Sequence, residues 1–165
     1  MKRFALLALL YCATLKADVL LTDSFDGSSI DSSKWNVSFL MSGSAVSQLN
    51  GQVDLVNRGM VSSKQSFVSP YEVTGSFINS NNYDIFTALV RSDGKYTGGT
   101  GNGIGIFFWS ESGDIMIYEA DKVVPTWVGR GYDVTPNQEH AFKIADNGSS
   151  VDIWFNNSFV VNYAS

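Results

Sequence analysis

The sequence predicts an all-β domain in which two antiparallel sheets pack as a sandwich. Apolar side chains recur with a period of two along most of the chain, and clusters of turn-forming residues separate these segments. No stretch of ten or more residues carries a helical apolar stripe. The length of 165 residues fits one domain. Only 16% of the residues are charged and the net charge is -5, so no nucleic-acid partner is expected, because phosphate contacts require clustered Lys and Arg.

The first 17 residues are expected to be a secretory signal peptide. A basic start at Lys2 precedes an uncharged apolar run over residues 4–13, and the small residue Ala17 occupies the cleavage position. The run is too short to cross a bilayer, which requires about 20 residues, so no transmembrane segment is predicted. Cleavage would remove Cys12, the only cysteine, and would leave a secreted or cell-surface domain over residues 18–165.

Two central strands are predicted at residues 83–91 and 103–109, because both segments are apolar on both faces. In the second segment, Ile104, Ile106 and Phe108 share one face, and Phe107 and Trp109 share the other. In an antiparallel sheet, this pattern indicates that both faces are covered or that the second face binds something. Further strands are expected at 52–57, 66–79 (one or two strands, bent near Pro70), 114–120, 141–145, 151–155 and 159–163.

The turn clusters at 92–94, 111–114, 146–149 and 155–158 divide these strands at the spacing of a sandwich or barrel. The glycine-rich stretch 92–102 is interpreted as a loop between the two central strands. Residues 159–165 still read as a strand. One alternative is therefore that the domain is truncated at its C-terminus and lacks its last strand.

Five segments, taken in order, resemble the concanavalin A-like lectin/glucanase superfamily. They are Asp23-Ser24-Phe25-Asp26-Gly27 with the following segment to Trp35, then 49–55, 88–94, 101–106 and the hairpin 146–158. The likeness covers residues 19–165, and the order of the segments is more specific than any one of them. It implies a two-sheet antiparallel jelly roll. The resemblance is to a secreted, non-catalytic member, because the catalytic motif of the glycosidases in this superfamily is absent.

That motif places three carboxylates, Glu-x-Asp-x-(x)-Glu, on one strand of family-16-type glycosidases. The nearest carboxylates here are Glu119 and Asp121, which share a strand face without a third acid before them. They are the only candidates for an atypical catalytic pair, and a retaining mechanism would need their carboxyl groups about 5–5.5 Å apart. The single histidine, His140, is expected at the surface, because no Gly-x-Ser-x-Gly nucleophile elbow accompanies it.

Aromatic side chains are the best candidates for ligand binding, because sugar rings stack their C–H faces on Trp or Tyr while polar groups bind the hydroxyls. Trp109 lies on the face of its strand opposite Ile104, Ile106 and Phe108. Trp127 is followed three residues later by Arg130. Arg91 is expected near Trp109, at the end of the neighbouring strand. Asn102 would contribute an amide from the glycine-rich loop. Core packing is the alternative for either Trp, and Trp35 and Trp154 are assigned to packing outright.

The function predicted is that of a carbohydrate-binding or adhesion module without catalytic activity, with a polysaccharide or glycan as partner. Two alternatives remain: a glycoside hydrolase using Glu119 and Asp121, and a structural surface domain that binds another protein. No cofactor is expected except, by the resemblance, a structural calcium ion, for which Asp23 and Asp26 are candidate ligands because Ca²⁺ takes oxygen donors. The sequence does not predict the oligomeric state.

Overall fold

The computed structural model describes residues 19–39, 41–57, 59–92, 103–119 and 125–164. These residues form twelve β-strands, and within them there is no helix. The strands are β1 (Trp35–Phe39), β2 (Ala45–Leu49), β3 (Gln52–Val56), β4 (Gly59–Ser63), β5 (Tyr71–Phe77), β6 (Ile85–Val90), β7 (Ile104–Trp109), β8 (Asp114–Glu119), β9 (Thr126–Gly129), β10 (His140–Asp146), β11 (Ser150–Phe155) and β12 (Ser158–Ala164).

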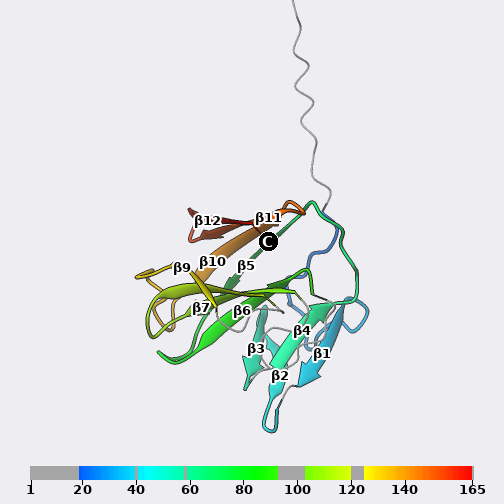
Figure 1. Cartoon of the computed structure of the whole chain (residues 1–165). Helices are drawn as coiled ribbons and strands as arrows, with labels where there is room; N and C mark the ends of the chain where they lie inside the picture. The colour runs from blue at the N-terminus through cyan, green and yellow to red at the C-terminus, as the bar shows by residue number, and fades with distance from the viewer. Residues whose placement is uncertain (1–18, 40, 58, 93–102, 120–124, 165) are drawn as a thin grey trace, which may run out of the picture.

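Two four-stranded antiparallel sheets form a sandwich. One has the order β12-β11-β10-β5, which we call the upper sheet, and the other has the order β6-β7-β8-β9, which we call the lower sheet. Figure 1 shows the upper sheet above the lower sheet. The chain passes from one sheet to the other between β5 and β6 and returns between β9 and β10. The predicted all-β sandwich is thus confirmed.

The core lies between these two sheets and is built by the inward-facing residues of alternating strands. On β7, the face predicted to be buried is buried: Ile106 and Phe108 have no exposed surface. Ile144 and Ile153 meet them from the upper sheet. At the β5–β6 edge, Phe77 stacks on Phe86 with ring centroids 4.4 Å apart. Such aromatic pairs contribute about 0.5–1.5 kcal/mol beyond the area they bury.

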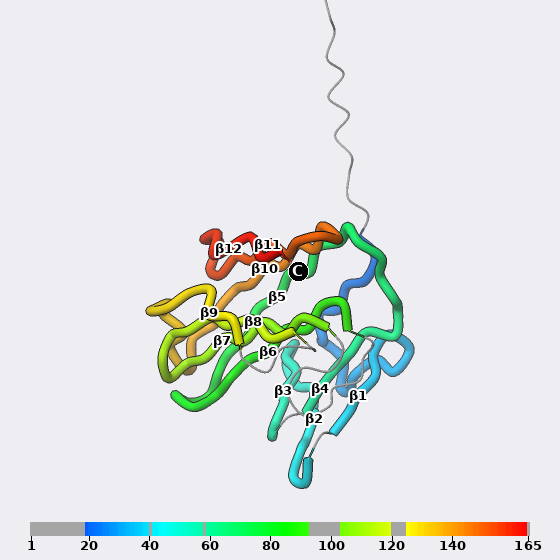
Figure 2. The backbone as a smooth tube through the Cα atoms, viewed as in Figure 1, coloured from blue at the N-terminus to red at the C-terminus, as the bar shows by residue number. Residues whose placement is uncertain are grey.

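The N-terminal strands form two further ladders, β1 with β4 and β2 with β3. Figure 2 shows both beside the sandwich, next to β6. A wide cleft separates them from β5 and β6, lined on one side by residues such as Leu55 and Val61 and on the other by residues such as Phe86 and Leu89. The sandwich core is therefore built by residues from β5 to β12. The N-terminal ladders lie beside it and do not contribute buried residues to it.

Most of the predicted strands correspond to observed ones, at 52–57, 83–91, 103–109, 114–120, 141–145, 151–155 and 159–163. The segment 66–79 contributes one strand, β5, which starts immediately after Pro70. The loop predicted at 92–102 lies almost wholly outside the described residues. The described part of the chain contains no helix that could span a membrane.

Candidate functional site

The outward side of the lower sheet carries a continuous group of aromatic side chains, which we call the aromatic face: Phe107, Trp109, Tyr118 and Trp127. Met116 pairs with Phe107 on one side and with Trp127 on the other. Directly opposed residues of an antiparallel pair point to the same side of a sheet. Trp109 and Tyr118 lie two residues from Phe107 and Met116, so alternation places them on this side too.

Glycine at position 105 lets the rings of this face lie close to the sheet. Gly105 pairs with Tyr118, and a Cβ atom on Gly105 would lie 2.9 Å from the Phe107 ring. The Phe107 ring therefore occupies the space above Gly105 and packs on Tyr118, with ring centroids 4.6 Å apart. Met116, paired with Phe107 and Trp127 on this side, is almost completely buried. Phe107 and Tyr118 thus form a preformed aromatic contact on this surface.

Trp127 and Arg130 form the most accessible part of the aromatic face. Trp127 lies on the edge strand β9 and is 41% exposed. The guanidinium carbon of Arg130 lies 4.9 Å from the centroid of its ring, within the range of a cation–π interaction. The pair offers a flat apolar ring beside five N–H donors. Two of the predicted binding residues are thus brought together.

Arg91, in contrast, lies far from Trp109. The register of β6 and β7 pairs Ile85 with Trp109 and Val90 with Ile104, so Arg91 follows the opposite end of the strand. The expectation that Arg91 lies near Trp109 is therefore wrong. The expectation assumed correctly that the two strands pair as a hairpin, but in this pairing Arg91 follows the end of β6 that lies opposite Ile104 and not the end opposite Trp109.

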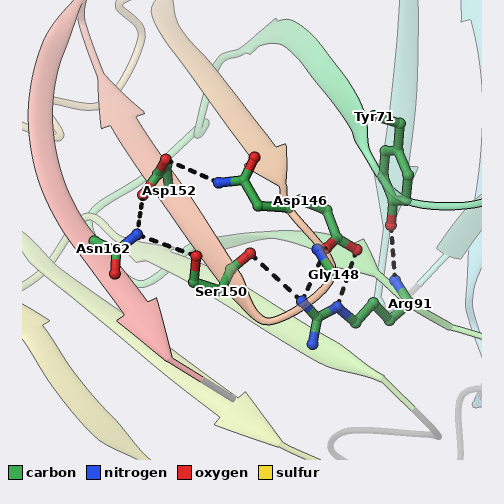
Figure 3. Close-up of polar contacts among 8 residues, drawn as sticks. Tyr71, Arg91, Asp146, Gly148, Ser150, Asp152 and Asn162 are labelled. Atoms are coloured by element: carbon green, nitrogen blue, oxygen red, sulfur yellow. Dashed lines mark hydrogen bonds and ion pairs between the residues drawn. The ribbon is translucent and has the colours of Figure 1, made fainter.

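Arg91 instead forms an ion pair between the two sheets (Figure 3). Its Nε and Nη2 donate to Asp146 Oδ2 and Oδ1 at 2.9 and 2.8 Å. The Asp146 side chain has no exposed surface. The amide of Gly148 also donates to Asp146 Oδ1 at 2.7 Å, and the amide of Arg91 donates to the hydroxyl of Tyr71 at 3.1 Å. This bidentate geometry is the strongest form of a carboxylate–guanidinium contact.

Burial of Asp146 would by itself raise the pKa of the carboxyl group. The hydrogen bonds from Arg91 and Gly148 outweigh burial and lower that pKa to about 2. The pair raises the pKa of the Arg91 guanidinium through the Asp146 hydrogen bonds. Burial raises the pKa of the Tyr71 hydroxyl. The ion pair of Arg91 with Asp146 therefore links the two sheets. Ligand binding by Arg91 stays a prediction.

Glu119 ends β8 at the same end of the sandwich as Arg91. It alternates with the buried Ile115 and Ile117, so its side chain belongs to the inner side of the lower sheet, where its charge favours the protonated form of Arg91. Its predicted partner Asp121 lies outside the described residues, as does Asn102. No catalytic distance between carboxylates is therefore defined.

Asp23 links the start of the described chain to strand β1. Its Oδ2 accepts from the Trp35 indole at 2.8 Å, and its Oδ1 accepts from the Phe25 amide at 2.9 Å. The bond from the Phe25 amide is the main reason that the pKa of Asp23 is lowered, followed by the bond from Trp35. No group of three His, Cys, Asp or Glu suited to a metal occurs among the described residues. Calcium binding by Asp23 and Asp26 stays a prediction.

His140 is buried, with 3% exposure, so the expectation of a surface histidine is wrong. Its ring stacks on Phe155 with centroids 5.3 Å apart. Nε2 lies 2.9 Å from the Thr135 carbonyl oxygen, and Nδ1 lies 3.2 Å from the Asn156 amide nitrogen. Nε2 therefore donates and Nδ1 accepts. Nothing in the local sequence pattern indicated these partners, because Thr135 and Asn156 lie outside the strand of His140.

Comparison of the sequence with protein-family models and with curated proteins gives no match. The fold, in contrast, is similar to solved structures. One is the carbohydrate-binding module CBM66 from Bacillus subtilis, with a TM-score of 0.65, 10% identity, and coverage of 80% of each chain. Another comes from work on endo-acting O-glycanases that prominent members of the human gut microbiota express to initiate mucin breakdown. Its TM-score is 0.60 at 18% identity, and the match covers 89% of this chain and 75% of that one. At these identities the likeness establishes the sandwich fold alone.

Proposed function

We propose that this chain is a secreted carbohydrate-binding module, without catalytic activity, that holds a glycan on its aromatic face. The observation that carries the proposal is the group of Phe107, Trp109, Tyr118 and Trp127 on one side of a sheet, with Arg130 beside Trp127. Sugar rings stack on such surfaces, and a guanidinium donates to their hydroxyls. The similarity in fold to a carbohydrate-binding module supports the proposal.

Secretion is part of the same proposal and rests on the sequence of residues 1–17, which has the layout of a signal peptide. The absence of catalysis rests on the missing three-carboxylate motif. The concanavalin A-like resemblance implies both, since it is to a secreted member that lacks the catalytic motif. The ligand is expected to lie across β7, β8 and β9, because these strands contribute the aromatic rings.

Native affinity electrophoresis tests the proposal. The purified protein migrates through gels that contain soluble β-glucans, galactans or mannans, beside Trp127→Ala and the control Tyr83→Ala. Tyr83 is also an exposed aromatic, at 77%, but lies in the connection between β5 and β6, outside the aromatic face. We expect retardation in one gel and about tenfold weaker binding for Trp127→Ala, because a lost stacking contact costs about 1.4 kcal/mol. Equal retardation of Trp127→Ala and the wild type would contradict the assignment.

One observation favours a second candidate function, the binding of another protein. The N-terminal ladders expose large apolar side chains, among them Phe39 and Leu49. Exposed apolar patches on soluble domains mark interaction surfaces. Free migration of the folded protein in every gel would move the assignment to this function.

A further inference from the structure

A second candidate site lies on the opposite side of the sandwich, on the outward side of the upper sheet. A hollow of about 340 Å³ is lined there by Thr74, Ala141, Lys143, Trp154 and Asn157, among others. We call it the Trp154 pocket. Its volume is at the lower end of the range for small-molecule sites, about 300–1,000 Å³, so it would hold a single small unit. Trp154, which was expected to serve packing alone, therefore lines a hollow at the surface.

A row of side chains across four strands holds the Trp154 ring in place. Lys143 pairs with Thr74 on one side and with Trp154 on the other, and Trp154 pairs with Phe159. The Lys143 ammonium lies 4.0 Å from the centroid of the Trp154 ring. Phe159 meets the ring edge to face, with centroids 5.5 Å apart. Neighbours on both strands thus preorganise the indole.

The hollow exists because a small residue lies beside this row. Ala141 precedes Lys143 by two residues on β10, so both point outward, but Ala141 leaves space above the sheet. Asn157, in the β11–β12 turn, bounds that space. The lining combines an indole, a hydroxyl, an ammonium and an amide. These are groups that hold a sugar by one apolar face and several hydroxyls.

The charges around the pocket favour a neutral ligand. The Lys143 ammonium lies 3.4 Å from a carboxylate oxygen of Glu72, so the positive charge at the pocket is balanced by a neighbour. The chain as a whole carries a net charge of -5, which disfavours the approach of an anionic polymer. Lys143 therefore acts here as a hydrogen-bond donor and as part of the indole's support.

We propose that the Trp154 pocket is a second glycan-binding site, which takes one unit of a neutral glycan. The inference rests on the proposed function of the protein, glycan binding, and adds a site and a ligand class to it. Because the pocket and the aromatic face lie on the outward sides of different sheets, one molecule would hold two glycan chains at once. The protein would then cross-link a polysaccharide as well as bind it.

Indole NMR tests this site separately from the aromatic face. The chain has four tryptophans, and ¹⁵N-labelled indoles give one N–H signal each, assigned through Trp→Phe variants. The protein is titrated with gluco-, manno- and galacto-oligosaccharides and with oligogalacturonate. We expect a saturable shift of the Trp154 signal with a neutral oligosaccharide. Ala141→Leu, which fills the hollow, should weaken this response at least tenfold, and the control Ala145→Leu, on the same side of β10, should not.

The outcomes separate the two proposals. A response of Trp127 without Trp154 would overturn the second site and leave the proposed function intact. A response of Trp154 without Trp127 would support the pocket and remove the glycan from the aromatic face. Silence of both signals with every neutral sugar, a response to oligogalacturonate alone, or an unchanged Trp154 response in Ala141→Leu would overturn the pocket as proposed.

Discussion

Arg91 reaches Asp146 because its backbone adopts a left-handed conformation, with φ of +54°. The preceding residue, Val90, points into the core, so regular alternation would turn Arg91 outward. The left-handed turn brings the guanidinium between the sheets instead. Sequence reasoning singled out Arg91 but not this role, because its partner is 55 residues away and nothing local marks the pairing. Trp127 and Arg130, three positions apart, were predictable as neighbours.

Removal of Arg91 is expected to be strongly destabilising. Arg91→Met leaves the Asp146 carboxylate buried without its cation, which costs about 3–5 kcal/mol of the free energy of unfolding. Glu72→Gln is the matched control, because it breaks the exposed Lys143–Glu72 pair at a cost of about 0–1 kcal/mol. Urea denaturation measures both. Equal, small losses in the free energy of unfolding for the two variants would show that the Arg91–Asp146 pair does not stabilise the packing of the two sheets.

The same pair predicts a loss of stability in acid. The pKa of Asp146 falls from an ordinary value of 3.8 to about 2 on folding, so the stabilisation is complete above about pH 5 and is lost as the pH falls through 4 to 2. The difference amounts to about 2 kcal/mol. Unfolding free energies measured between pH 6 and 2 should decline less steeply in Asp146→Asn, which lacks the titrating group. A parallel decline would contradict the assignment.

At the scale of strands, alternation predicted the elements with strong apolar periodicity, and the buried face of β7 was predicted residue by residue. Strands β1, β2 and β4 were not predicted, because Ser and other polar residues interrupt their apolar pattern. Strand β9 has four residues, too few for a period to appear. Their pairing comes from neighbours distant in sequence, such as β1 with β4. The aromatic face was predicted in part: Trp109 and Trp127 were named as binding residues and Phe107 was placed on the face of Trp109, but Tyr118 was not assigned to this face.

The turn between β11 and β12 separates two roles of asparagine. Asn156 and Asn157 both have positive φ, +47° and +64°, as a two-residue hairpin turn requires. Asn156 also accepts from the Ala141 amide at 2.9 Å and contacts His140. Asn156→Gly should therefore cost about 1–3 kcal/mol by leaving these groups unpaired. Asn157→Gly, the control, should leave thermal stability unchanged or raise it; a larger loss for Asn157→Gly would contradict this account.

At the scale of the whole molecule, the sandwich separates the aromatic face from the Trp154 pocket by the thickness of two sheets, as the layers in Figure 1 show. The sandwich was predictable because periodicity and turn spacing are properties of the whole chain. Which outward side binds was not predictable, because it depends on the register of strands and on which rings other residues leave exposed.

This arrangement predicts cross-linking by a monomer. Beads coated with the polysaccharide that retards the protein in electrophoresis should agglutinate when the protein is added. Trp127→Ala or Ala141→Leu should each abolish agglutination and yet still bind to single beads, because each keeps one site. Size-exclusion chromatography establishes that the protein added is monomeric. Agglutination by both variants at wild-type concentration would contradict cross-linking through these two sites.

Oxidation footprinting measures directly whether a glycan covers the aromatic face. N-bromosuccinimide oxidises accessible indoles, and mass spectrometry of peptides reports the rate at each tryptophan with and without the soluble β-glucans, galactans and mannans. We expect one polysaccharide to slow oxidation of Trp127, which is 41% exposed in the free protein, while the rate at Trp35 stays the same. An unchanged rate at Trp127 with every polysaccharide would contradict the claim.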